Sequence, residues 1–283
     1  MRKFLRQSAG TIIAGFSNLD SWVHSSRTWI MLAALYLLCM TNALRDERAV
    51  QLATGSAASL NLGEIVFLQG FRGFNFGLST MIFLVMMSTF PKRSAYQEYC
   101  MIRSDRRKWF HGQMIYAFIM CLLFMVLVIL FTASFSAFHF PLSFEWGEFI
   151  LSGEASFYLN LFIPNDFLTN MTPFAATLLV CLPTLLCWFS ICMILMLSNL
   201  FDHPGAGIAA VAMLLISNYI FIQCEIPFYP LHYACSYYFY ESNRIGNDTI
   251  RMLLFHLLVN GALYTVMRIR LWRMDIAAEG AQA

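Results

Sequence analysis

The chain has 283 residues, of which 59% are hydrophobic and only 12% are charged, and its formal net charge is +2. Soluble globular proteins carry about a quarter charged residues, so this composition excludes a soluble domain and predicts a polytopic membrane protein. The eight cysteines form no CxxC pair, which excludes the usual spacing of a zinc site.

The first predicted element is the N-terminal segment 1–21, which begins with Arg2, Lys3 and Arg6. Its apolar part is short and is interrupted by glycine and threonine, whereas a signal peptide has a longer apolar core. We therefore expect a retained amphipathic helix that lies in the cytoplasmic interface of the membrane.

Membrane-crossing stretches follow along the rest of the chain. A span needs about 20 apolar residues, because the helix must satisfy its own backbone polar groups across the hydrocarbon layer. Six candidates lie near 28–44, 74–90, 113–138, 173–200, 206–223 and 251–267. The sequence thus predicts an all-α fold with six transmembrane helices in a single transmembrane domain, residues 1–283, with a kink at Pro183.

The segment 60–73 does not fit this series easily, because it is apolar but carries Glu64 and Arg72. It either extends the second span or forms a short half-buried element on the outer side, and the second arrangement is favoured. Glu64 and Arg72 are candidate pathway residues that would pair near an outer gate; a solvated position at the interface is the simpler expectation.

The distribution of cations predicts the orientation of the spans. With the N-terminus in the cytoplasm, 13 of the 18 Lys and Arg residues fall on inner segments, including the basic loop 91–112 and the C-terminal stretch 268–273. The positive-inside rule favours this orientation, with both termini cytoplasmic and an even number of spans. The outer segment 139–172 has no Lys or Arg, and Cys224 and Cys235 share another outer loop, where a disulfide depends on the compartment.

The basic loop 91–112 reads PKRSAYQEYCMIRSDRRKWFHG. Its aromatic and apolar residues alternate with polar ones at roughly helical spacing, which is typical of a short helix lying on a membrane surface. Such a helix either serves as an inert interfacial strap or docks a cytosolic protein.

One pattern around this loop resembles a known family. The residues that carry it are Phe90, Pro91, Tyr99, Arg103, Arg106, Arg107, Lys108, Trp109, Gly112, Gln113 and Tyr116, followed by Asn199, Leu200 and Gly205. In spacing and in the six-span layout they resemble the type 2 ABC transporter permeases of Gram-positive bacteria.

The resemblance implies a membrane-spanning subunit of an ATP-binding-cassette exporter in the bacterial plasma membrane. A separate cytosolic ATPase subunit, which binds ATP and Mg²⁺, would drive it, and a second identical or related permease would complete the pathway. Residues 94–111 would form a coupling helix that docks on the ATPase. The docking residues would be Tyr99, Arg103, Arg106, Arg107, Lys108 and Trp109.

The chain itself has no recognisable catalytic site. Its lysines, Lys3, Lys92 and Lys108, never follow glycine, so a P-loop is absent, and neither HExxH nor G-x-S-x-G occurs. We therefore expect no enzyme activity, no cofactor or metal in this chain and no nucleic-acid partner. His256 and Asn260, one helical turn apart in the sixth span, are either packing residues or part of a pathway. A standalone membrane immunity or sensory protein without a motor is the alternative function.

Overall fold

The computed structural model describes residues 22–55, 60–91, 106–153, 157–159, 163–201, 203–223 and 245–280. This part of the chain consists of helices and connecting turns and contains no strand, which confirms the predicted all-α class. The predicted N-terminal interfacial helix, the loop residues Tyr99 and Arg103, and the pair Cys224 and Cys235 lie outside the described residues.

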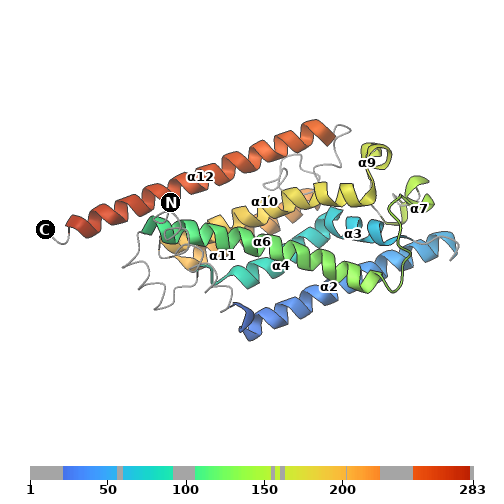
Figure 1. The fold of residues 1–283 in the computed structure, drawn as a ribbon, viewed down its shortest axis with the longest axis horizontal. Helices are drawn as coiled ribbons and strands as arrows, with labels where there is room; N and C mark the ends of the chain where they lie inside the picture. The colour runs from blue at the N-terminus through green and yellow to red at the C-terminus, as the bar shows by residue number, and fades with distance from the viewer. Residues whose placement is uncertain are drawn as a thin grey trace, which may run out of the picture.

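The long helices run roughly along one axis, as Figure 1 shows. The helix bounds are α2 (Ser26–Thr54), α3 (Leu62–Phe71), α4 (Gly73–Met87), α6 (Arg106–Ser136), α7 (Glu148–Leu151), α9 (Asn165–Asn170), α10 (Pro173–Leu200), α11 (Pro204–Gln223) and α12 (Ile245–Gly280). We call the end that holds α7 and α9 the capped end. The opposite end, where α6 begins and where Arg268 and Arg270 lie on α12, is the basic end.

Within the described residues, four helices are long and apolar enough to cross a membrane, and they mark the chain as membrane-embedded. They are α2, the Trp109–Ser136 part of α6, α10, and the Thr249–Trp272 part of α12. Large apolar side chains such as Leu122, Leu178 and Leu257 are exposed along them, as expected of surfaces that face lipid.

The other two predicted spans differ from the expectation. Helices α3 and α4 meet the criteria for a span only when taken together, and they form a pair bent by 70°. The apolar part of α11 is the shorter helix Pro204–Asn218. Residues 60–73 thus form a separate, largely buried helix at the capped end rather than a straight extension of the second span.

Two helices begin or end beyond the predicted limits. Helix α2 continues past residue 44 through Arg45–Arg48 to Thr54, and Gly55 ends it in the left-handed conformation (φ 58°) that glycine adopts without strain. Helix α6 begins at Arg106, so residues 106–111 belong to the helix of the third span and not to a separate coupling helix. The buried side chains of Trp109 and Phe110 continue the buried face of α6.

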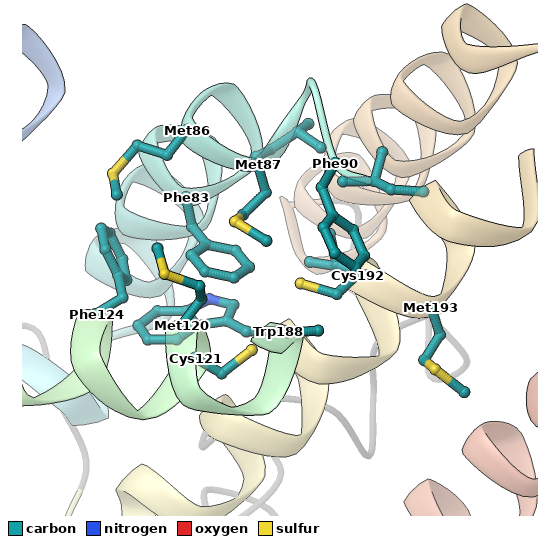
Figure 2. Close-up of a cluster of buried hydrophobic side chains, with 14 of the residues drawn as sticks. Phe83, Met86, Met87, Phe90, Met120, Cys121, Phe124, Trp188, Cys192 and Met193 are labelled. Atoms are coloured by element: carbon teal, nitrogen blue, oxygen red, sulfur yellow. The ribbon is translucent and has the colours of Figure 1, made fainter. Parts of the chain in front are cut away.

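Two apolar cores fill the bundle. The basic-end core contains side chains of α2, α4, α6, α10, α11 and α12, including Leu35, Phe83, Phe124, Trp188 and Met267. Figure 2 shows its centre, where Met87, Cys121 and Cys192 gather with Phe83 and Trp188 between α4, α6 and α10. The capped-end core contains Ala43, Val50, Phe67, Phe71, Phe149, Phe167, Val180 and Met252.

Helices α10 and α11 cross closely at the basic end, directly after the turn that joins them. A Cβ atom added at Gly207 would lie 2.8 Å from the Ser198 Cβ and closer still to its hydroxyl. Small residues allow such close approach between helices in membranes. Gly205, two residues earlier on α11, has no heavy atom within 4 Å of an added Cβ.

Replacing Gly207 with Ala should therefore lower the thermal unfolding midpoint of the purified protein in detergent. Overpacking of this kind costs about 1–3 kcal/mol. The matched variant Gly205→Ala should leave the midpoint almost unchanged, and the cost of Gly207→Ala should shrink in a Ser198→Gly background. Equal midpoints for the two alanine variants would contradict the close crossing.

Candidate functional site at a break in the second span

The second span is interrupted at Arg72. Its backbone is extended there (φ −74°, ψ 123°), and the axes of Leu62–Phe71 and Asn75–Met87 differ by 70°. The backbone remains hydrogen-bonded across the break, because the Arg72 amide donates to the Leu68 carbonyl and the Phe76 amide donates to the Arg72 carbonyl. Interrupted helices of this kind often form the binding sites of membrane transporters.

The Arg72 side chain joins three segments at the break. One of its guanidinium nitrogens lies 2.6 Å from a carboxylate oxygen of Asp46 on α2, and another donates to the Leu159 carbonyl at 3.3 Å. The two side chains of the ion pair are only 11% and 3% exposed. Arg45 lies 3.5 Å from the same Asp46 oxygen. Removing one partner of a buried ion pair costs about 3–5 kcal/mol, so this pair holds α2 against the broken span.

A cluster of amides lies next to the ion pair. The Gln69 Oε1 accepts hydrogen bonds from Asn42 on α2 (3.2 Å) and from Asn75 on α4 (3.3 Å), and its Nε2 donates to the Cys39 sulfur at 3.8 Å. Asn75 is fully buried, and its Oδ1 has no hydrogen-bond partner in the described part of the chain. The break is thus surrounded by polar groups that an apolar membrane interior does not satisfy.

A small cavity of about 20 Å³ lies beside the break, enough for one water molecule. Gln69 and Gly70 form one wall, and Cys181 and Thr184 of α10 form another. Most of the remaining wall is apolar, and it comes largely from α6. The cavity has room for a water molecule but not for a peptide, a lipid or a drug.

Glu64 connects α3 to the outer segment at the capped end. This carboxylate is fully buried; it accepts the Asn61 amide (2.8 Å) in a capping box and the Gly147 amide (2.6 Å) of the outer segment. The Asn61 side chain donates to the Glu145 carbonyl, and the Trp146 indole donates to the Met171 carbonyl. Segments far apart in the sequence form one cap over the break.

The predicted pathway residues Glu64 and Arg72 therefore have separate roles. Arg72 pairs with Asp46, whereas Glu64 caps α3 and binds Gly147. The expectation of a solvated position at the interface is wrong for both. Backbone amides stabilise the buried Glu64 carboxylate, and the Asp46 carboxylate stabilises the Arg72 guanidinium inside the protein.

The other two predicted pathway residues lie on α12. His256 is 2% exposed, and among the described residues neither of its ring nitrogens has a hydrogen-bond partner; the Asn260 Oδ1 is also buried and unpartnered there. His256 is therefore buried, as a packing residue would be, but without a hydrogen bond to a described neighbour. Tyr264, one further turn along α12, lies 3.3 Å from the His111 ring on α6.

The predicted docking residues are only partly described. Arg106, Arg107 and Lys108 lie on the first turn of α6. Trp109 is 5% exposed and belongs to the basic-end core, so its ring packs inside this chain and is not available for docking on a partner.

Sequence reasoning missed Asp46 and the amides Asn42, Gln69 and Asn75. Cys39, Asn42 and Asp46 are spaced three and four residues apart and lie on one face of α2, a signal that was available. It was overlooked because the charged run 45–48 suggests the end of a span. No family model, no curated protein and no solved structure matches this chain.

The Glu64 contacts generate a stability prediction. In Glu64→Gln, the side chain keeps one acceptor oxygen and directs an NH₂ group at an amide donor, so one of the two bonds is lost at a cost of about 1–3 kcal/mol. The unfolding midpoint in detergent should fall. Glu148→Gln, an exposed site on the same segment, is the control and should have no effect.

The unpartnered His256 ring generates a prediction of the opposite sign. Replacing His256 with Leu removes buried polar atoms that lack partners, so the unfolding midpoint should rise. His111→Leu, which removes the partner of Tyr264, should give no such gain. A midpoint that falls in His256→Leu as much as in His111→Leu would mean that His256 has a stabilising partner after all.

Proposed function

We propose that this chain is the membrane-spanning permease subunit of a bacterial ATP-binding-cassette exporter, driven by a separate ATPase subunit. The observation that carries the proposal is the way in which the basic loop is attached at both ends. Its residues 92–105 lie outside the described part of the chain, but the residues flanking them are packed into the basic end of the bundle.

The first attachment is at Phe90, where the second span ends. The Phe90 ring stacks on Tyr116 of α6 with centroids 5.8 Å apart, and the Phe90 carbonyl accepts a hydrogen bond from Asn199 of α10 at 2.8 Å. The second attachment is Trp109, which is buried in the basic-end core at the start of α6. Residues that carry the family resemblance thus pack into one end of the bundle.

Such anchoring suits a loop that transmits force. A helix docked on a motor moves the membrane part only if it is tied to the spans, and here the ties reach α4, α6 and α10. The cations of the loop would provide directional bonds to carboxylates of the ATPase. ATP and Mg²⁺ would bind to that partner and not to this chain.

The proposal places six crossings in the bacterial plasma membrane, with both termini in the cytoplasm. The bent pair of α3 and α4 would count as one crossing and α11 as another. The cavity beside the break is water-sized, so the cargo path would run between this chain and a second permease copy or a related permease.

The experiment is to purify the chain with the product of its neighbouring gene and to measure ATP hydrolysis in lipid nanodiscs. Combined replacement of Arg103 and Arg106 with Ala should weaken assembly or uncouple it, reducing the stimulated ATPase rate about tenfold, as loss of interface hot spots does. Arg268→Ala removes an exposed cation from the same end of the bundle and serves as the control.

Two results would count against the proposal. One is undiminished assembly and hydrolysis in the double variant. The other is the absence of a Walker motif from the adjacent reading frames, which would favour a standalone immunity or sensory protein. Trp109 is unsuitable for this test, because its loss would disturb the core of the chain itself.

A further inference from the structure

The two apolar cores meet at a layer of polar and helix-breaking residues that crosses several helices. On α2 the boundary falls between Cys39 of the basic-end core and Ala43 of the capped-end core, and Asn42 occupies it. In the broken span it falls between Phe71 and Phe76, at Arg72 and Asn75. No large apolar side chain bridges the two cores at these points.

The same boundary is found on α10 and α12. On α10 it falls at Val180, because Cys181 already packs against the basic-end core, and Pro183 and Thr184 follow within about one turn. On α12 it falls between Met252 and Met267, a stretch that contains the unpartnered His256. Polar layers weaken packing between the apolar parts on either side, because their hydrogen bonds are easily exchanged for water.

Two of these positions interrupt the regular backbone hydrogen bonding of their helices and lie near each other. The second span bends at Arg72, and Pro183 removes a backbone donor from the middle of α10. A Cβ added at Gly70 would lie 3.5 Å from the Val180 side chain, so the break and the proline stretch are at the same height in the bundle.

The capped end, in contrast, is internally well connected. Glu64 binds the Gly147 amide, the Leu62 amide donates to the Pro141 carbonyl, and Phe67 packs against both Trp146 (5.2 Å between ring centroids) and Phe167 (5.8 Å). Helix α3 and the described residues 140–153 and 163–171 of the outer segment therefore form one packed body. Figure 1 shows this body, with α3, α7 and α9, gathered at one end of the molecule.

We propose that this body is a gate that swings about Arg72 and Pro183, and that the Asp46–Arg72 ion pair is its latch. When the latch is closed, Arg72 ties the gate to α2, and Gln69 and Gly70 of the gate line the cavity together with Cys181 and Thr184 of α10. Breaking the ion pair releases the gate and lets water from the capped end reach Cys181 and Thr184. Its role in releasing cargo rests on the proposed function, whereas the motion itself belongs to this chain alone.

The test uses Cys181 as the only cysteine of an otherwise cysteine-free protein in nanodiscs. A membrane-impermeant methanethiosulfonate reagent modifies thiols only where water reaches them. Asp46→Asn should raise the rate of Cys181 modification about tenfold, as expected when a local opening becomes more populated. The charge swap Asp46→Arg with Arg72→Asp should return the rate to the parental value. Glu47→Gln, the next residue on α2, should leave the rate unchanged.

A second reporter separates gate opening from unfolding. Cys121 is fully buried in the basic-end core, so as a single cysteine it should stay unreactive in Asp46→Asn. Faster modification of both Cys181 and Cys121 would mean general unfolding and would overturn the proposal. An unchanged Cys181 rate in Asp46→Asn, or a charge swap that fails to restore the parental rate, would overturn it too. No ATPase is present, so the outcome is independent of the test of exporter function.

Discussion

The arrangement of this protein depends on a charged pair that lies where a membrane helix is interrupted. Arg72 occupies the break and is neutralised by Asp46 on the neighbouring helix, while Leu159 accepts a further hydrogen bond. An uncompensated charge at this depth would be expensive, so the geometry of the two helices is set by the need to keep the guanidinium and the carboxylate together. The bend, the amide cluster and the cavity are all arranged around that requirement.

The sequence was a good guide where apolar patterning decides the structure and a poor one where polar contacts do. The long helices α6, α10 and α12 could be predicted because runs of Leu, Phe and Met have few other stable arrangements in a bilayer. The continuation of α2 through Arg45–Arg48 could not be predicted from the sequence. The residue that neutralises the buried Asp46 carboxylate is Arg72, which lies 26 positions away. The same holds for Glu64, whose two acceptor contacts exist only once the outer segment has folded over α3.

The two proposals divide the molecule in a consistent way. The basic end anchors the loop that would meet a motor, through Phe90, Trp109 and Asn199. The capped end forms the body that would open, and a polar layer separates the two. In the proposed motion, α4 and α10 would connect the two ends, because they run from the anchored end to the two hinges. Coupling in such a design needs no large rearrangement inside either core, because each core can stay packed while the layer between them adjusts.

The Glu64–Gly147 contact also bears on how the protein is made. The two residues are 83 positions apart, and the whole of α6 lies between them. Ribosomes add about 5–20 residues per second, so α3 is synthesised roughly 4–17 seconds before Gly147, whose amide binds Glu64. During that interval a half-span carrying a buried carboxylate and an arginine has to be held at the insertion machinery or shielded by α2. Because the outer segment is synthesised late, the second span must enter the membrane before the contact that stabilises it has formed. Insertion of this span is therefore a vulnerable step in the biogenesis of the protein.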